Sequence, residues 1–163
     1  MRGASQIKAV GLATTLPLNG GWANPVSTDP SQESSLAGIR PISGDYFGAM
    51  GTPLSMGRVL SDADTETSEA AVVINETAAR KLFAGDPIGQ HLKLGQPGSR
   101  DEWRTVVGVV ADIKERGLDS GPDPDVYIPY YQLGDVATQM AGRGLYLIMR
   151  SDGVTLPFAC RSR

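Results

Sequence analysis

Turn-forming residues interrupt this chain at short intervals, and they limit every strand or helix to a short length. The 163 residues include 20 Gly and 11 Pro, and no uninterrupted apolar stretch is longer than the five residues of 70–74 and 145–149. A helix that crosses a bilayer needs about 20 mostly apolar residues. We therefore expect no membrane-spanning segment and a domain assembled from short elements.

The composition excludes several classes of protein. The formal net charge is −3 without a basic block, so neither nucleic acid nor an anionic lipid surface is an expected partner. The N-terminus lacks the apolar segment of about 7 to 15 residues that a signal peptide requires. Cys160 is the only cysteine, which excludes a disulfide framework, a Cys-based zinc site and a redox pair within the chain.

The N-terminal part of the chain alternates between strand and turn patterns. Residues 6–15 form a predicted strand, which ends at the Pro and paired Gly of 16–21. Residues 19–38 are rich in Gly, Ser, Asn, Pro and Gln, with Trp22 as their only aromatic residue. We expect this segment to be a long exposed loop.

The next segment contains a predicted short helix. After a short strand at 39–42, aromatic and Met side chains fall at helical spacing within 46–50. Ser43 is the expected N-cap of this helix and Gly51 the expected C-cap.

A strand followed by a helix is predicted in the middle of the chain. The apolar run 70–74 is typical of a buried strand. Asn75 then caps a helix through Phe83, in which apolar side chains four residues apart form one side. Asn75 also begins an Asn-Glu-Thr glycosylation acceptor sequence, but its place between strand and helix favours the capping role.

Two strands of a predicted hairpin follow this helix. Residues 88–94 alternate with a period of two, which directs Leu92 inward and His91 and Lys93 outward. Residues 103–111 carry apolar residues on both faces, so we expect a central strand there.

The C-terminal part adds two strands and completes the fold prediction. Residues 126–131 form a short strand in which Pro129 indicates an edge position, and residues 145–150 form the last strand. With about six strands and two or three short helices, the pattern favours an α+β fold with mixed sheets, in two lobes joined near 51–69.

His91 is the only histidine, so it is the only imidazole that could act as a general base. It alternates outward on its strand beside Lys93, which favours an exposed structural residue. There is no Gly-x-Ser-x-Gly turn, and no motif places a Ser and an acid to complete a triad with His91. We predict no catalytic residue.

Asp62, Asp64 and Glu66 have the spacing that opens a calcium-binding loop. The pattern then fails, because Thr67 stands where the turn requires Gly and Val73 where a bidentate Glu is required. We expect a solvated acidic turn instead, in which an Asp bonds its own local backbone. A second acidic turn is expected around Asp119, Asp123 and Asp125.

Features of nucleotide binding and base stacking are missing from the sequence. Neither Gly-x-x-x-x-Gly-Lys-Ser/Thr nor Gly-x-Gly-x-x-Gly occurs, so the chain is not itself an ATPase. The aromatic residues have no accompanying basic groove and are expected in the core or at its rim. We therefore predict no cofactor-binding and no metal-binding residue.

Several short segments, taken in order, resemble the extracytoplasmic core domain of MacB-like ABC-transporter permeases, within the FtsX-like permease group. Each segment alone is common, but their order and spacing agree over about residues 7–150. The segments that carry the resemblance are Gly11–Leu18, Ile42–Leu54 with Gly57–Arg58, Val72–Phe83, Asp86–Leu94, Trp103–Asp112, Arg116–Asp119 and Val126–Tyr130.

The resemblance implies a two-lobed fold and a role in coupling. Residues 1–50 and 136–163 would form part of a porter-like lobe, and residues 51–135 a second extracytoplasmic lobe. ATP hydrolysis on a separate nucleotide-binding domain would move transmembrane helices, and the extracytoplasmic domains would shift to export or hand over substrate. The implied partners are those helices, the ATPase subunit, a second permease copy and a periplasmic adaptor protein, at the bacterial inner membrane.

Three hypotheses follow for the function. The first is a non-enzymatic, periplasmic module of an ABC-transporter permease, with the predicted loop 19–38 facing an adaptor or substrate. The second is a free-standing soluble domain that binds an apolar ligand or a peptide between its lobes. The third is a small hydrolase that uses His91. Because the flanking transmembrane helices of the family are absent, we expect a truncated piece of a larger protein, and a monomer in solution.

Overall fold

Strands dominate the structure. The computed structural model describes residues 7–16, 23–113, 121–133, 144–151 and 154–160. In these ranges ten strands accompany two α-helices and one 3-10 helix, so a mixed α/β fold with few helices is confirmed, with more strands than predicted. None of these helices has the length and hydropathy that a membrane crossing requires. The elements are β1 (Ile7–Ala13), β2 (Ala23–Ser27), β3 (Ser35–Gly44), α1 (Tyr46–Met50), β4 (Leu54–Gly57), β5 (Ala71–Asn75), α2 (Glu76–Leu82), β6 (His91–Leu94), β7 (Trp103–Val110), β8 (Asp125–Pro129), η1 (Tyr130–Leu133), β9 (Leu145–Ser151) and β10 (Val154–Cys160).

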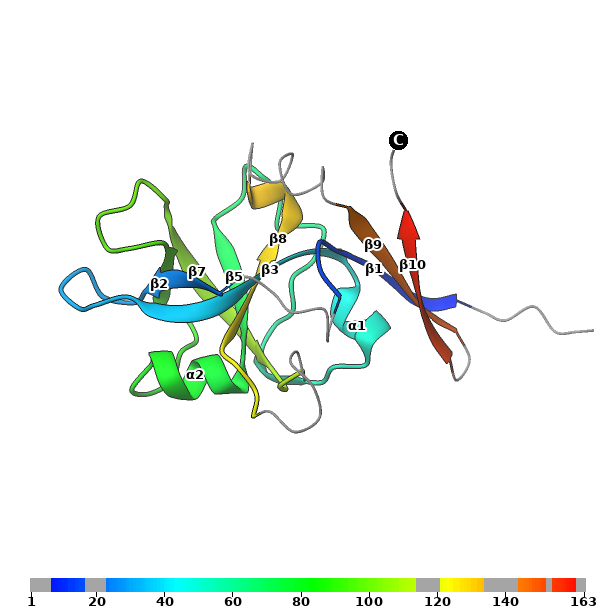
Figure 1. Cartoon of the computed structure of the whole chain (residues 1–163), viewed down its shortest axis with the longest axis horizontal. Coiled ribbons are helices and arrows are strands. Elements are labelled where there is room, and N and C mark those ends of the chain that lie inside the picture. Colours follow the sequence, from blue (N-terminus) through cyan, green and yellow to red (C-terminus); the bar gives the residue numbers. More distant parts are fainter. Residues whose placement is uncertain (1–6, 17–22, 114–120, 134–143, 152–153, 161–163) are drawn as a thin grey trace, which may run out of the picture.

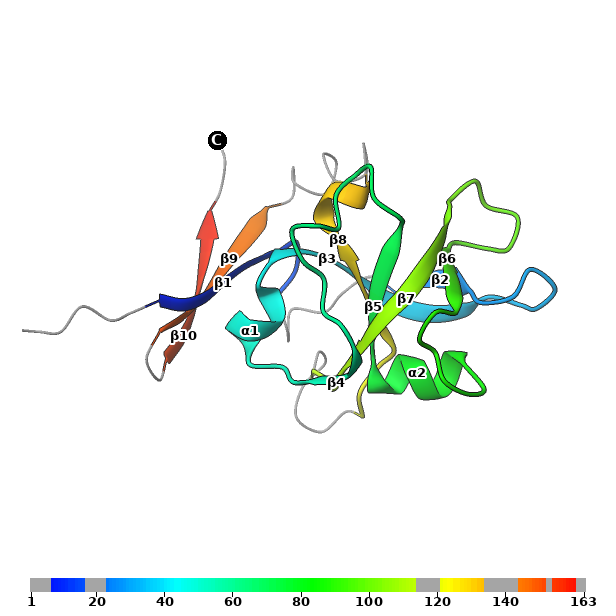
Figure 2. The same cartoon turned by 180° about the vertical axis from the view of Figure 1, so that it is seen from behind.

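Six of the strands close into a ring (Figure 1 and Figure 2). β2 pairs with β3 and β6, β6 pairs with β7, β7 pairs with β5, and β5 pairs with β8. The parallel pairing of β8 with β3, from Gly38 opposite Asp125 to Ile42 opposite Pro129, completes the ring. Every ring strand therefore has a hydrogen-bonded neighbour on both sides, which leaves no free edge.

The main hydrophobic core fills this ring. It takes alternate residues of the ring strands, such as the fully buried Val72 and Ile74 of β5. Ala78 of α2 and Phe83 at its C-cap pack against the same core, and Figure 1 shows α2 below the ring strands. The other members are Val26, Ala37, Ile39, Leu92, Val106, Val109, Val126 and Ile128. The apolar runs of the sequence thus supply the interior of one ring.

A second core lies outside the ring, against an antiparallel sheet of three strands. In this sheet β10 pairs with β9 and β9 with β1, and β1 joins the C-terminal end of β3. Both views place α1 between the ring and this sheet (Figure 1 and Figure 2). The second core includes Tyr46, Phe47, Val73, Tyr127 and Ile148. Strand β3 therefore belongs to both sheets.

Several predicted elements are confirmed. The expected strands at 6–15, 70–74, 103–111 and 145–150 correspond to β1, β5, β7 and β9. β7 is central, because it pairs with β4, β5 and β6. The strand at 145–150 is not the last one, since β10 follows and pairs with it.

The predicted helix at 46–50 is confirmed as α1, but one of its caps is not. Gly51 ends the helix in the left-handed conformation, with φ of 70°. The N-cap is Asp45, whose side chain accepts a hydrogen bond from Gly48 N, and not Ser43. Ser43 still lies in β3, opposite Leu12 of β1, because the strand runs further than its local sequence indicates.

The expected long loop at 19–38 is wrong where the structure describes it. Residues 23–27 form β2 and pair with β3, so only 28–34 connect the two strands. Val26 is 1% exposed and lies opposite Leu94 of β6. The local composition misleads here because the pairing that orders β2 is distant in sequence. Trp22 lies outside the described residues.

The expected edge strand and acidic turn near β8 are also wrong. β8 pairs with β3 on one side and β5 on the other. Pro129 is tolerated because it is the last residue of the strand. Asp125 begins β8 and is fully buried, so it does not belong to a solvated turn. Asp119 lies outside the described residues.

The two outward side chains predicted on β6 differ in the structure. His91 is exposed, as predicted. Lys93 is buried, because its Nζ donates to Pro97 O at 3.3 Å and lies 5.7 Å from the centre of the Trp103 ring on β7. The ammonium group thus keeps a polar partner and lies near an aromatic ring that attracts its charge.

Candidate functional site

The neighbours of His91 stand in the wrong order for a catalytic triad. His91 Nδ1 lies 3.4 Å from Thr105 Oγ1, which donates to Glu69 Oε1 at 2.7 Å. In a triad the imidazole lies between the acid and the hydroxyl group, and accepts the hydroxyl proton. Here the hydroxyl group lies in the middle and its proton is directed at the carboxylate. The geometry at His91 therefore lends no support to the hydrolase hypothesis.

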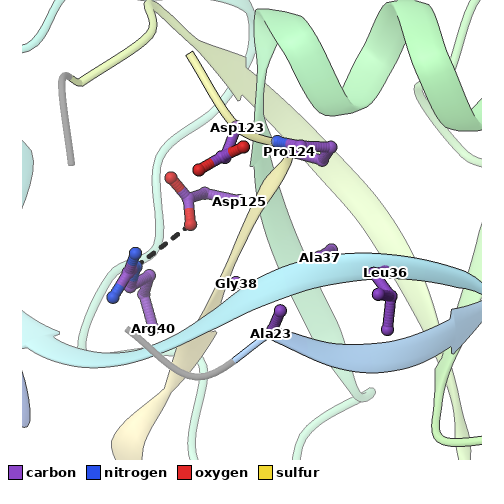
Figure 3. A pocket seen from close by; sticks show the side chains of 8 residues that line it. All are labelled: Ala23, Leu36, Ala37, Gly38, Arg40, Asp123, Pro124 and Asp125. Carbon is purple, nitrogen blue, oxygen red and sulfur yellow. Dashed lines mark hydrogen bonds and ion pairs between the residues drawn. The ribbon is translucent and has the colours of Figure 1, made fainter. Parts of the chain in front are cut away.

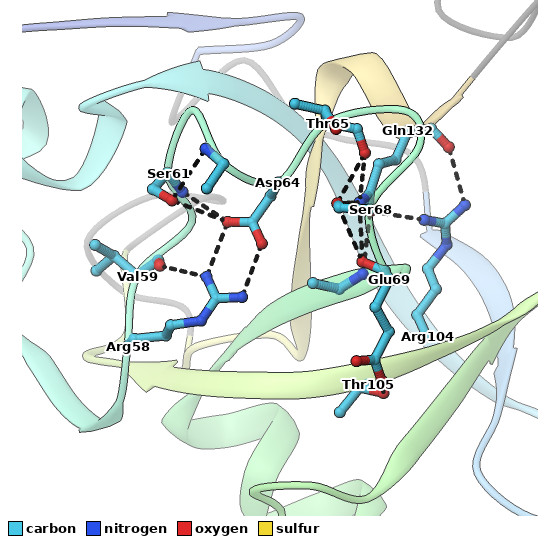
Figure 4. A network of polar contacts seen from close by, with 12 residues as sticks. Arg58, Val59, Ser61, Asp64, Thr65, Ser68, Glu69, Arg104, Thr105 and Gln132 are labelled. Atoms are coloured by element: carbon cyan, nitrogen blue, oxygen red, sulfur yellow. Dashed lines mark hydrogen bonds and ion pairs between the residues drawn. The ribbon is translucent and has the colours of Figure 1, made fainter.

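Asp64 anchors the loop between β4 and β5 (Figure 4). Arg58 Nη1 and Nη2 each donate to one oxygen of its carboxylate at 2.8 Å, and Ser61 N donates at 2.8 Å. Burial raises the pKa of Asp64, but the hydrogen bonds from Arg58 and Ser61 outweigh this and bring the pKa below its ordinary value of 3.8. The predicted bond of an Asp to its local backbone is thus confirmed at Asp64, but the expectation of a solvated turn is wrong for this residue, which is 5% exposed because it faces Arg58.

The acidic residues of this loop do not gather around a common point. Asp64 is turned inward onto Arg58, whereas Asp62 and Glu66 are exposed. Within the described part of the chain, no group of three or more His, Cys, Asp or Glu side chains is arranged to hold a metal ion.

Gln132 of η1 holds the second half of the same loop (Figure 4). Its Nε2 lies within hydrogen-bond distance of Thr65 O at 3.0 Å, Ser68 Oγ at 3.1 Å and Glu69 O at 3.1 Å. Its Oε1 accepts from Ala71 N at 3.0 Å, at the start of β5. Arg104 of β7 fixes the backbone of this glutamine, because its Nη2 donates to Gln132 O at 3.1 Å.

A buried ion pair lies at a pocket beside the start of β8 (Figure 3). Arg40 Nε donates to Asp125 Oδ1 at 3.0 Å, and the two side chains are 6% and 0% exposed. A Cβ atom on Gly38 would fall 2.1 Å from Asp125 Oδ1, so only glycine leaves room for the carboxylate at this place in β3. The pocket has a volume of about 230 Å³, and its other lining residues are Ala23, Leu36, Ala37, Asp123 and Pro124.

Asn75 joins β5, α2 and β8, which confirms its predicted capping role. Its Oδ1 accepts from Ala78 N at 2.8 Å and from Asp125 N at 3.0 Å, and its Nδ2 donates to Asp123 O at 2.8 Å. The side chain is fully buried, so it is not presented to a glycosylating enzyme.

The polar clusters of the described residues connect strands and loops. Arg40 and Gln132 were not among the predicted candidates. Arg40 leaves a signal in the sequence, since a charged residue interrupts the apolar strand at 39–42. Gln132 leaves none, because a single amide belongs to no motif or spacing pattern.

Fold and clusters together define a strand-rich, mixed α/β domain in which buried charges and amides fix distant segments to one another. The chain belongs to the family of MacB-like periplasmic core domains, whose model matches residues 4–156. This confirms the resemblance to the core domain of MacB-like ABC-transporter permeases.

Two curated relatives are similar to part of the chain. The macrolide export ATP-binding/permease protein MacB of Aggregatibacter actinomycetemcomitans is 29% identical over 127 residues, which are 77% of this chain and 19% of the relative. The protein of the same name from Hahella chejuensis is 32% identical over 107 residues, 64% of this chain and 15% of the relative. The chain thus spans less than a fifth of the length of each.

Two solved structures share the fold. The periplasmic region of MacB from Actinobacillus actinomycetemcomitans superposes with a TM-score of 0.63 and 24% identity, covering 93% of this chain and 62% of that one. The extracellular domain of the noncanonic ABC-type transporter YknZ from Gram-positive bacteria gives a TM-score of 0.58 and 16% identity, covering 94% and 70%. At these identities the likeness concerns the fold alone.

Proposed function

We propose that this domain couples ATP-driven movement of the transmembrane helices of a parent permease to export or hand-over of substrate, and that it has no catalytic role itself. Its family and the ATP-binding/permease names of its relatives support the proposal. The observation that carries it is β3, a strand of ten residues that pairs with β2 and β8 of the ring and with β1 of the second sheet. Because β3 is hydrogen-bonded to strands of both bodies, a displacement of one would be passed to the other through its backbone.

The same proposal includes a division into two lobes. We assign residues 1–50 and 136–163 to a partial porter-like lobe and residues 51–135 to the second lobe. The grouping of β1, α1 and β9 around the second core supports this division. β2 and β3 come from the first segment but pair with ring strands, so the two lobes share β3 and a packed interface.

We further propose that the tip of the β2–β3 hairpin faces the periplasmic adaptor. Residues 30–33 are exposed, and the tip is ordered because Asp29 Oδ1 accepts from Ser31 N at 2.8 Å and Ser31 Oγ at 2.7 Å. These bonds lower the pKa of Asp29 because they favour its carboxylate form, which is ionised at neutral pH. A groove of about 480 Å³ between residues 31–34 and 96–97 offers a polar contact surface beside it.

The coupling role is tested in the complete parent permease with its ATPase, reconstituted in vesicles. Gly11 pairs with Gly44 of β3, and a Cβ atom on Gly11 would lie 2.4 Å from Tyr46 Cα, so Gly11→Val displaces β1 from α1. We expect several-fold less export per ATP hydrolysed, with hydrolysis retained. Gly98→Ala is the matched control, because nothing lies within 4 Å of its added Cβ. Equal export per ATP in the two variants would contradict the proposal.

The alternative function is a free-standing domain that binds a ligand, and one candidate location is the pocket beside the buried Arg40–Asp125 pair. Its volume of about 230 Å³ is below the range of roughly 300 to 1,000 Å³ that is usual for small-molecule sites. A ligand-dependent rise in the melting temperature of the isolated chain would favour this alternative over the coupling role.

A further inference from the structure

We infer that residues 58–69 form a strap over the second core, and that Gln132 is the latch that holds its second half closed. Val59 and Leu60 of the strap pack against the second core, and Leu60 is 8% exposed. Leu60 also lies beside Ile42 and Pro129, with a small cavity of about 20 Å³ between the strap and these strands. The first half of the strap therefore covers apolar side chains of the second core.

The strap is fixed in two places by different means (Figure 4). Its first half is closed onto itself, because Arg58 and Ser61 both donate to Asp64. Its second half depends on a side chain from another part of the chain. Gln132 Nε2, with two N–H groups, lies within hydrogen-bond distance of Thr65 O, Ser68 Oγ and Glu69 O, and its Oε1 accepts from the Ala71 amide.

The chemistry of an amide explains why one residue is sufficient as a latch. A glutamine side chain has two N–H donors and one carbonyl acceptor, so it bonds backbone groups of both types at once. Gln132 is 8% exposed, and water therefore competes little for these bonds. Because the amide is uncharged, its release leaves no buried ion behind.

The position of Gln132 connects the strap to the rest of the fold. η1 directly follows β8 and is the last described element before β9, the middle strand of the second sheet. A displacement of η1 withdraws Gln132 and frees residues 65–69, while the Arg58–Asp64 pair keeps residues 58–64 folded. The inference goes beyond the proposed coupling role, because it concerns a property of the chain itself and does not require transport.

The test is amide hydrogen exchange, resolved by residue, on the chain of 163 residues. In Gln132→Ala we expect the Ser68 and Ala71 amides to exchange roughly ten times faster, because the bonds that order them are lost. The Ser61 and Asp64 amides, bonded to Asp64 Oδ2 and Ser61 O, should keep their rates. Asp64→Asn is the matched control and should give the reverse pattern.

Gln132→Glu provides a second variant, which has the same shape as the wild-type side chain. It retains an acceptor for the Ala71 amide but lacks the donors to Thr65 and Glu69, so Ser68 should exchange faster while Ala71 stays protected. The Val73 amide in β5 reports whether the whole domain has been destabilised. Equal acceleration at Ser61 and Ser68, or unchanged exchange at Ser68 in both variants, would overturn the inference. If Gln132→Ala does not fold, the exchange pattern of Gln132→Glu decides.

Discussion

Arg40 Nε and Asp125 Oδ1 meet at 3.0 Å across the parallel pairing of β3 and β8 that closes the ring. Removal of one partner takes away the opposite charge that the other faces in the buried pair, which costs more than the pair contributes. We expect Arg40→Met to lower the free energy of unfolding by about 3 kcal/mol. The double variant Arg40→Met, Asp125→Leu should recover most of this loss. Urea unfolding followed by fluorescence measures both, and additive losses would contradict the expectation.

Gly108 allows the strap to approach β7. A Cβ atom at this position would fall 1.9 Å from Arg58 O, a backbone atom that does not give way easily. We expect Gly108→Ala to destabilise the domain by about 2 kcal/mol, within the usual range of overpacking. Thermal unfolding should show no such loss for Gly98→Ala, whose Cβ meets open space. A Gly108→Ala melting temperature equal to that of the wild type would mean that the contact is looser than described.

The lowered pKa of Asp64 makes part of the stability dependent on pH. Because the pKa in the folded state lies below the ordinary value of 3.8, the carboxylate stabilises the fold fully above that value. The stabilisation is lost as the pH falls from there through the folded-state pKa. We expect the wild type to exceed Asp64→Asn in stability by a constant amount between about pH 5 and 7, and the gap to close in acid. Urea midpoints measured at several pH values show whether the gap closes.

Asn75 performs two roles that substitution separates. In Asn75→Ala the Ala78 amide loses its cap and the link to β8 is lost, so we expect a destabilisation of about 2 kcal/mol. Asn75→Ser keeps an oxygen for the cap but is too short to join Asp123 and Asp125 as well. Its melting temperature should therefore fall between those of the wild type and Asn75→Ala. Identical values for the two variants would show that only one role matters.

The parts of the fold that could be predicted depend on neighbours in sequence. The apolar run of β5 and the cap at Asn75 follow each other directly, and each is stabilised within a few residues of itself. Predictions from such local patterns hold in the folded domain because the tertiary contacts stabilise the same strand and the same cap.

The parts that could not be predicted depend on distant partners. β2 is a strand because Val26 lies opposite Ser35 of β3 and Leu94 of β6, although its own composition indicates a loop. Arg40 and Asp125 are 85 positions apart, and Gln132 and Thr65 are 67 apart. No spacing rule connects such residues, so neither the ion pair nor the latch can be predicted from the sequence; both are recognised only in the folded structure.

The ring also determines at what point during synthesis the domain has no unpaired ring-strand edges through which incomplete chains could associate. β8 is the last ring strand in the sequence, and its pairing joins residues 38–42 to residues 125–129. A nascent chain that stops before β8 carries β3 and β5 with one unpaired edge each and an unfilled gap beside the main core. Unpaired strand edges are sites of association between incomplete chains. The cell therefore has to protect more than a hundred residues of β-rich polypeptide until one five-residue strand leaves the ribosome.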